Sequence, residues 1–332
     1  MATRKYTLKK LPHENLRVVD RREFKINYKN ELNSAQYDAV TSTIGPHLVI
    51  AGAGTGKTRT IVYRVSYLIE NGVDPEKILL LTFTRKAARE MLSRASQLLD
   101  SRCDHVAGGT FHSFANMILR HYASLIGYQP NFTILDQSDA EDTLNIIRRQ
   151  LKMDEKGRRF PQKGILQDVY SRSVNTGVPV QRIVEKEYPR YVDDLDDMTK
   201  VFQVYHAFKK QNNKMDYDDL LLNFVGLLSS NKDVRQRLSI KYQYIMVDEY
   251  QDTNKLQSEI VRLLTEVHDN VMVVGDDAQC IYSFRGSTIT NILNFEKEYK
   301  DCKVIKLEEN YRSTQQILDL ANAVMKNSFS VS

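Results

Sequence analysis

A glycine-rich loop is the first feature of this sequence whose residue types could do chemistry. Residues 48–58 read LVIAGAGTGKT, an apolar segment followed by glycines, Lys57 and Thr58. In such a loop, backbone N–H groups point at a polyphosphate, the lysine reaches its β and γ groups, and the hydroxyl binds Mg²⁺. Ala51 stands where the strict pattern has its first glycine. We expect a phosphate site formed by Gly52, Ala53, Gly54, Thr55, Gly56, Lys57, Thr58 and Arg59.

An acidic pair follows a second apolar segment, where residues 244–252 read YIMVDEYQD. Ligands of parallel sheets bind at the carboxyl ends of the strands, so Asp248 and Glu249 would lie beside the glycine-rich loop. Asp248 would then hold Mg²⁺ together with Thr58, and Glu249 would orient or deprotonate an attacking water. An acidic pair at a strand end is commonly a solvated turn, but the phosphate loop upstream favours the catalytic interpretation.

A second nucleotide pattern competes with this interpretation. Residues 213–216 read NKMD, which matches the N-K-x-D signature with which GTPases read guanine. The segment follows a charged helical stretch, and it precedes the acidic pair, which reverses the order in GTPases. We therefore interpret the match as a coincidence.

Short apolar segments alternate with amphipathic helices from residue 47 onward, which is typical of a parallel sheet covered by helices. Strands are expected at 47–51, 78–83, 106–110, 244–248, 271–275 and 303–307. After residue 110 helical spacing replaces the alternation, with a helix start at Ser138, three residues before Glu141. A loop is expected at 154–159, which reads DEKGRR. The expected fold class is α/β, a mostly parallel sheet with an inserted all-helical subdomain.

Composition excludes several classes of protein. The length of 332 residues predicts about two domains. The three cysteines have no metal-binding spacing, which argues against a disulfide framework or a structural zinc. No apolar run reaches the roughly 18 residues of a membrane span, so we expect no membrane partner. Residues 1–30 carry nine Lys or Arg against three acidic residues, a basic arm that could touch phosphates or be a solvated terminus.

Six blocks in this order resemble the motifs of the UvrD/Rep/PcrA family of superfamily 1 DNA helicases. They are AGAGTGKT (51–58), TFTRKAAREM (82–91), GTFHSFA (109–115), VDEYQDTN (247–254), VGDDAQCIYSFRGS (274–287) and ENYRST (309–314). The opening LNSAQYDAV (32–40) is similar to the adenine-recognition motif of that family. The resemblance implies a RecA-like P-loop NTPase domain, 1A, over 31–111 and 214–302, a helical domain 1B over 112–213, and the start of a truncated domain 2A over 303–332.

The resemblance also implies roles around ATP and Mg²⁺. Gln36 would read adenine and Tyr311 would stack on it. Gln279 would sense the γ-phosphate, and Arg312 would reach that phosphate from the second lobe. With Lys57 and Glu249 these two residues make the implied catalytic set. We expect the segment of Arg312 to be mobile, because the domain that supports it in the family is absent from these 332 residues.

Contacts with single-stranded DNA are implied by the same resemblance. Phe83, Tyr282 and Phe284 would stack on bases. Any base can stack on an aromatic side chain, so this contact does not depend on the DNA sequence. Arg85 stands where the family has asparagine, and Phe284 where many members have tryptophan. The implied DNA-binding residues are Phe83, Arg85, Thr110, His112, Tyr282, Phe284 and Arg285.

The function implied is that of the ATP-binding lobe of a DNA helicase that moves 3′ to 5′ on single strands, as a fragment without the second motor lobe. Its implied partners are single-stranded DNA, duplex junctions and the remaining helicase domains, and its implied place is the nucleoid in a bacterial-type cytoplasm. Two alternatives stay open: the motor part of an ATP-dependent helicase-nuclease subunit, and a nucleotide-gated DNA-binding module without turnover.

Overall fold

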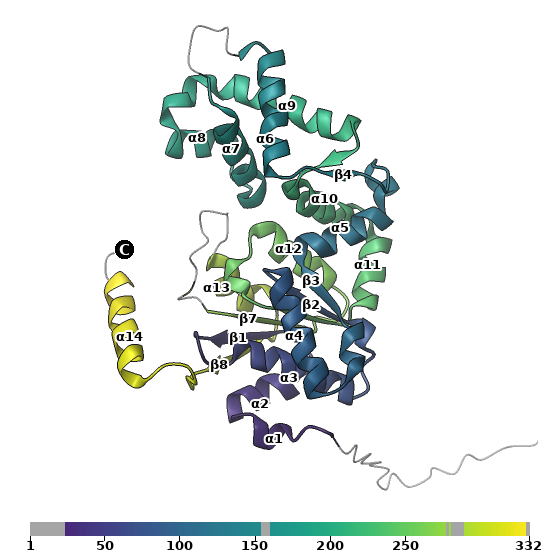
Figure 1. Cartoon of the computed structure of the whole chain (residues 1–332), viewed down its shortest axis with the longest axis vertical. Helices are drawn as coiled ribbons and strands as arrows, with labels where there is room; N and C mark the ends of the chain where they lie inside the picture. The colour runs from purple at the N-terminus through teal and green to yellow at the C-terminus, as the bar shows by residue number, and fades with distance from the viewer. Residues whose placement is uncertain (1–23, 154–159, 277–278, 280–288, 330–332) are drawn as a thin grey trace, which may run out of the picture.

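A six-stranded parallel sheet forms the centre of the molecule (Figure 1). The computed structural model describes residues 24–153, 160–276, 279 and 289–329. The strand order is β3-β2-β6-β7-β1-β8, and every neighbouring pair is parallel. The strands are β1 (His47–Ala51), β2 (Ile78–Thr82), β3 (Ala107–Thr110), β6 (Tyr244–Val247), β7 (Val271–Gly275) and β8 (Lys303–Leu307). All six expected strands are confirmed to within one residue at each end.

Two layers of helices cover the sheet because successive residues of each strand point to opposite faces. In β2, Ile78 and Leu80 belong to one core, and Leu79 and Leu81 belong to the other. The first core includes side chains of α2 (Ser34–Thr41), α3 (Lys57–Glu70) and α4 (Arg85–Leu98). The second includes those of α5 (Phe111–His121), α10 (Tyr217–Ser230), α11 (Lys232–Lys241), α12 (Lys255–Leu264) and α13 (Ile289–Glu298). Burial on both faces explains why the four central strands, β1, β2, β6 and β7, read as continuous apolar runs.

A separate helical body stands beyond the sheet (Figure 1). Its own core contains residues from Ala140 to Tyr205. Its helices are α6 (Gln137–Gln150), α7 (Lys163–Thr176), α8 (Val180–Glu187) and α9 (Leu195–Gln211). The expected helical insertion is therefore present, and the expected loop at 154–159 lies outside the described residues.

Three details of this insertion differ from expectation. The helix expected to start at Ser138 begins instead at Gln137 with Asp136 as its cap, whose carboxylate accepts the Asp139 N–H at 2.9 Å. Two short strands, β4 (Thr133–Ile134) and β5 (Lys214–Met215), pair in parallel, although two residues are too short to show a strand period. Helix α5 packs in the sheet core, so the separate core begins well after the expected boundary at residue 112.

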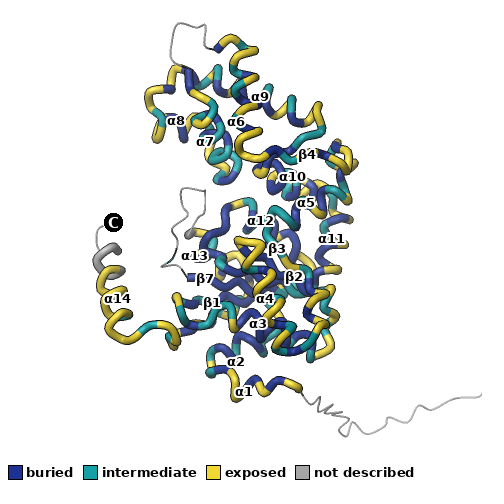
Figure 2. Tube along the Cα trace, in the orientation of Figure 1, coloured by how far each residue is buried: buried dark blue, intermediate teal, exposed yellow. Residues whose placement is uncertain are grey.

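The two ends of the described chain differ in how they pack on the sheet domain. At the N-terminal side, α1 (Tyr28–Glu31) packs on the sheet domain with Ile26 and Tyr28 buried. At the other, β8 pairs with β1, so residues 303–307 belong to this sheet and not to a following domain. Beyond it, α14 (Gln315–Phe329) stands apart with Ile317, Leu320 and Val324 exposed (Figures 1 and 2).

Short 3-10 turns complete the described elements: η1 (Pro75–Lys77), η2 (Ser101–His105), η3 (Ala123–Ile126), η5 (Pro189–Asp194) and η6 (Tyr250–Asp252). None of the described helices is both long enough and apolar enough to cross a bilayer.

Candidate active site

The glycine-rich loop links β1 to α3 in a conformation that requires glycine. Gly54 and Gly56 have φ values of +86° and +93°, in the left-handed region that glycine adopts at no steric cost. A Cβ on Gly54 would lie 2.6 Å from Cβ of Arg312, and one on Gly56 would lie 2.7 Å from Nε2 of Gln36. The loop ends at the N-terminus of α3, with Gly56 as the N-cap. Free N–H groups and the helix dipole favour an anion there.

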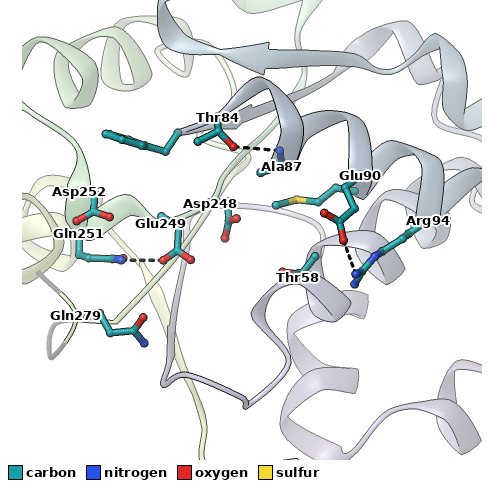
Figure 3. A pocket seen from close by; sticks show the side chains of 12 residues that line it. Thr58, Thr84, Ala87, Glu90, Arg94, Asp248, Glu249, Gln251, Asp252 and Gln279 are labelled. Atoms are coloured by element: carbon teal, nitrogen blue, oxygen red, sulfur yellow. Dashed lines mark hydrogen bonds and ion pairs between the residues drawn. The ribbon is translucent and has the colours of Figure 1, made fainter. Parts of the chain in front are cut away.

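The carboxyl end of β6 brings the acidic pair to this loop (Figure 3). Lys57 Nζ donates to Glu249 Oε2 at 2.9 Å, and Gln251 Nε2 donates to the same oxygen at 2.7 Å. The backbone of Glu249 is left-handed, with φ of +52°, which is uncommon outside glycine and turns the chain sharply after the strand. The loop lysine and the proposed base thus meet across 192 positions of sequence.

Asp248 meets the requirement for a magnesium ligand. It is only 6% exposed, and its Oδ1 atom has no hydrogen-bond partner among the residues that the structure describes. Burial, together with the nearby charge of Glu249, raises the pKa of Asp248 to about 7. A bound cation would favour the ionised carboxylate, and Thr58 lines the same cavity. Magnesium at phosphate sites uses one or two carboxylates together with substrate oxygens, so this pair of residues fits the ion.

Two adjoining cavities surround these groups. One, of about 480 Å³, is lined by the glycine-rich loop, Arg59, Tyr311 and Arg312. The other, of about 450 Å³, is lined by Asp248, Phe83 and neighbouring residues (Figure 3). Four residues line both cavities: Thr58, Arg94, Glu249 and Gln279. Volumes of this order are those of small-molecule sites in general.

Gln279 lies on the wall that the two cavities share. Its amide donates to Asp276 Oδ2, and the Asp276 N–H donates to Gln251 Oε1 at 3.1 Å. Gln251 in turn donates to Glu249. The ends of β6 and β7 are thereby joined by a chain of hydrogen bonds that includes two side-chain amides and the carboxylate of the proposed base.

The segment after β8 closes the larger cavity from within this chain. The Tyr311 N–H donates to the Gly54 carbonyl at 2.9 Å, and Asn310 Nδ2 donates to the Ala53 carbonyl at 2.7 Å. These bonds hold the backbone next to Arg312, whose side chain is exposed and lines the cavity. The expectation that this segment lacks support was therefore wrong, because hydrogen bonds to the glycine-rich loop hold it.

Gln36 lies behind the loop and does not line either cavity. It is 2% exposed, its Nε2 donates to the Thr55 carbonyl at 3.1 Å, and its Oε1 accepts the Asn33 N–H in the cap of α2. Its role as adenine reader stays a prediction, since this structure shows it bound to the loop backbone.

The predicted DNA-binding residues lie at the ends of two neighbouring strands, where Thr82 is paired with Thr110. Phe83 is 37% exposed and lines the smaller cavity, and Arg85 is exposed at the start of α4. Thr110 caps α5 with its hydroxyl. The other predicted contacts, Tyr282, Phe284 and Arg285, lie outside the described residues.

His112 is placed differently from a freely exposed base contact. Its ring meets the Tyr217 ring edge-on, with 5.9 Å between ring centres. Burial lowers the pKa of His112 to about 4, so the imidazole is neutral near pH 7. A neutral ring offers a hydrogen bond or a stacking face, and no charge for a phosphate.

Several residues that line the cavities were not predicted from the sequence. Glu90 and Arg94 lie one turn apart on α4, pair with each other, and lie on the same side of Thr58 (Figure 3). Asp252 lines the smaller cavity, and burial and the charge of Glu249 raise its pKa to about 6. Asp252 belongs to the motif VDEYQDTN (247–254), which indicates a role at this site, whereas only the position of α4 in the fold reveals Arg94.

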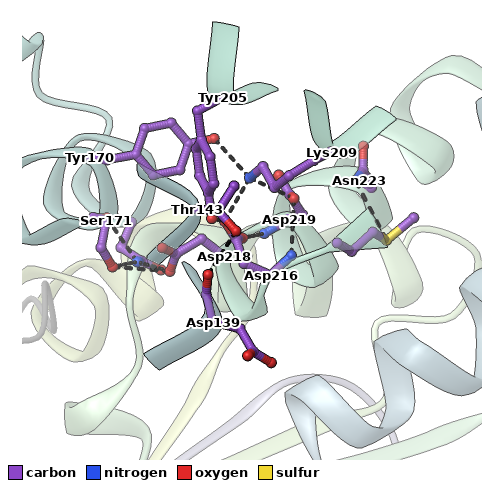
Figure 4. Close-up of polar contacts among 12 residues, drawn as sticks. Asp139, Thr143, Tyr170, Ser171, Tyr205, Lys209, Asp216, Asp218, Asp219 and Asn223 are labelled. Atoms are coloured by element: carbon purple, nitrogen blue, oxygen red, sulfur yellow. Dashed lines mark hydrogen bonds and ion pairs between the residues drawn. The ribbon is translucent and has the colours of Figure 1, made fainter. Parts of the chain in front are cut away.

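The NKMD segment has a structural role. Asp216 caps α10 and is buried with Lys209, whose Nζ donates to its Oδ2 at 2.6 Å (Figure 4). Tyr205 donates to the same oxygen at 2.9 Å, and Asp219 forms a second ion pair with Lys209 at 2.7 Å. The carboxylate that would read guanine is thus enclosed in a buried network between the insertion and α10, which agrees with a chance match.

Comparison with known proteins identifies the family. A family model described as the UvrD/REP helicase N-terminal domain matches residues 32–300. The chain belongs to this family. ATP-dependent DNA helicase PcrA of Staphylococcus aureus (strain Mu50 / ATCC 700699) is 39% identical over 299 residues, which cover 90% of this chain and 40% of that relative. PcrA of Bacillus subtilis (strain 168) is 41% identical over 299 residues, covering 89% and 39%.

The resemblance to UvrD/REP helicases is therefore confirmed, and so is the α/β fold class with its parallel sheet. The chain spans about two-fifths of the length of these curated relatives, with 40% of the first covered.

Proposed function

We propose that this chain is the ATP-binding lobe of a DNA-dependent ATPase and helicase. The observation that supports this most is the meeting of Lys57, Asp248 and Glu249 in two joined cavities at the carboxyl edge of the sheet. Membership of the UvrD/REP family agrees with it, and so does the name of the PcrA relatives, ATP-dependent DNA helicase.

In this proposal the triphosphate of ATP lies along the glycine-rich loop. Backbone N–H groups at the start of α3 and the Lys57 ammonium bind the β- and γ-phosphates. Thr58 and Asp248 would hold Mg²⁺, which neutralises charge on the phosphate oxygens when bound. Lys57 must then exchange its contact with Glu249 for the phosphates.

Glu249 is the proposed general base. Its Oε2 accepts a hydrogen bond from Gln251, which holds the carboxylate in place. Glu249 and Gln279 both line the two cavities. The attacking water forms its bond to the γ-phosphorus while its proton passes to Glu249, and the bond from phosphorus to the bridging oxygen of ADP breaks. Arg312, which lines the same cavity, would stabilise the charge on the transferred group.

The DNA strand is proposed to cross the edge where β2 and β3 end. Phe83 is exposed there and shares a cavity with the carboxylates, which would place a base contact beside the hydrolytic site. An aromatic face grips any base, as a translocating motor requires. We propose movement 3′ to 5′, action at duplex junctions, cooperation with further helicase domains, and a nucleoid location in a bacterial cytoplasm.

Nucleotide binding and hydrolysis test this function together. The chain is titrated with a fluorescent ATP analogue in Mg²⁺, and phosphate release is followed with and without single-stranded DNA. We expect saturable ATP binding that Lys57→Ala weakens. Failure of the chain to bind ATP would contradict the proposal, and binding without any turnover in the presence of further helicase domains would favour a nucleotide-gated module.

A further inference from the structure

The segment before residue 32 lies outside the family match but is packed against the phosphate-binding helix. Tyr28 is buried, and its hydroxyl donates to Glu70 Oε2 at 2.5 Å. The Lys25 N–H donates to the other oxygen of Glu70 at 2.6 Å. The Tyr28 ring also meets the Tyr67 ring edge-on, with 5.1 Å between ring centres. Both Glu70 and Tyr67 belong to α3, so the short helix α1 is fixed to the helix that begins at the glycine-rich loop.

The last residue of α1 reaches the nucleotide cavity through Arg59. Arg59 Nη2 donates to the Glu31 carbonyl at 2.8 Å and to its Oε2 at 3.1 Å. The Tyr63 hydroxyl donates to the same carboxylate at 3.2 Å. The Arg59 guanidinium carbon lies 4.6 Å from the centre of the Tyr63 ring. One face of the guanidinium therefore rests on Tyr63, and Glu31 occupies one of its edges.

The same stretch of chain also contacts a second residue that lines the cavity. Arg59 and Tyr311 both line the 480 Å³ cavity. Asn33, two residues after Glu31, donates from Nδ2 to the Tyr311 hydroxyl at 2.9 Å. A guanidinium plane and a phenol ring are both suitable surfaces for stacking a nucleobase. Glu31 and Asn33 thus each contact one of two planar side chains that line this cavity.

We propose that Glu31 is a positioning residue for the nucleobase, acting through Arg59. An arginine side chain loses rotamer freedom when a ligand immobilises it, and a side chain that is already held loses less on binding. Glu31 therefore raises affinity for ligands that carry a base, and has no such effect on the triphosphate alone. This inference rests on the proposed ATP site and extends that site to residues 24–31.

Binding titrations with two ligands test the role of Glu31. The full chain and its Glu31→Gln variant are titrated with a fluorescent ATP analogue and, by calorimetry, with inorganic tripolyphosphate, both in Mg²⁺. Exposed ion pairs are worth little, so we expect about threefold to fivefold weaker ATP binding and no loss for tripolyphosphate. In an Arg59→Ala background, Glu31→Gln should change ATP affinity no further. Glu266→Gln, which breaks the ion pair between the exposed Glu266 and the part-buried Arg235, is the control and should change neither affinity.

Two results would overturn this role. Unchanged ATP affinity in Glu31→Gln would show that Arg59 needs no support. Equal losses for ATP and tripolyphosphate would show that Glu31 acts on the loop or the fold as a whole, and melting temperatures would identify the second cause. If the unsubstituted chain bound no ATP, the proposed function would fail first, before any variant is compared.

Discussion

Among the described residues, two side chains donate hydrogen bonds to the Glu249 carboxylate, and they serve different purposes. Lys57 is the cation that a triphosphate would compete for, and Gln251 is a neutral donor that can keep the carboxylate oriented once the lysine has moved. Substitution of Lys57 should therefore affect mainly ATP binding, whereas substitution of Glu249 should affect mainly ATP hydrolysis.

Lys57→Ala is expected to weaken ATP binding about tenfold or more, since a hydrogen bond to a charged group contributes about 1.5–3 kcal/mol. Glu249→Gln should bind ATP as well as or better than the unsubstituted chain, because Lys57 loses its competing carboxylate, and it should not hydrolyse ATP. Fluorescent-nucleotide titration measures both affinities. Equal loss of binding in the two variants would contradict these separate roles.

Asp248 should make stability depend on pH in Mg²⁺-free buffer. Burial raises its pKa to about 7, above the value of about 3.9 expected in the unfolded chain. The folded state then holds the proton more tightly, so this group lowers stability as pH rises from about 4 to about 7, by at most about 4 kcal/mol.

Asp248→Asn should accordingly raise the melting temperature at pH 8 and have little effect near pH 4, while it weakens Mg²⁺-dependent ATP binding. Melting curves at both pH values give the comparison. A variant that is less stable than the parent at pH 8 would show that the carboxylate has a stabilising partner.

At the scale of elements, a buried polar network joins the insertion to the sheet domain. Lys209 of α9 is fully buried and pairs with Asp216 and Asp219 at the start of α10 (Figure 4). Its ammonium also lies 4.3 Å from the centre of the Tyr205 ring. Such a network depends on all its members, because removal of one leaves the others buried without partners.

Lys209→Met is expected to lower the free energy of unfolding by about 3–5 kcal/mol, the usual cost of breaking a buried ion pair from one side. Lys163→Met is the matched control: Lys163 pairs with Asp142 at 2.6 Å, but both side chains are exposed. That change should cost less than about 1 kcal/mol. Urea denaturation compares the two variants, and similar costs would refute the importance of the buried network.

At the scale of the whole molecule, the residues proposed to bind ATP all lie on one lobe. The glycine-rich loop, the acidic pair and Tyr311 meet within the described chain. Arg312 is placed at the cavity by its neighbours, but its side chain is exposed and no described ion pair fixes it. ATP binding should therefore require this lobe alone, whereas rapid ATP hydrolysis should require further contacts.

The isolated chain is expected to bind Mg²⁺-ATP and to show little DNA-stimulated hydrolysis and no strand separation. An arginine held at the transferred phosphate is worth about 10³–10⁵ in rate in related phosphoryl-transfer enzymes. Strand separation on a tailed duplex is the measurement, with Lys57→Ala to exclude a contaminant. Robust unwinding by this chain alone would show that a second copy or this lobe itself supplies what is expected from another domain.

The strands, the glycine-rich loop and the acidic pair were predictable because each depends on residues close together in sequence. A parallel strand needs a short apolar run, and a phosphate loop needs glycine where φ is positive, as at Gly54 and Gly56. The N-terminal cap of α6 shows the limit of prediction from local sequence. Asp136 and Ser138 are both good capping residues, and packing decided between them.

Sequence by itself determined the class of fold, the family and the residues that would meet a triphosphate, since local spacing and residue type suffice for these. Only the tertiary structure decided which distant residues line the cavity or contact the residues that line it. Glu31, Arg94 and Asn310 lie in segments far apart in sequence, and no period or motif links them. They come together because the sheet order and the packing of α1 and α4 bring their helices and loops to one edge, and such long-range contacts leave no local pattern.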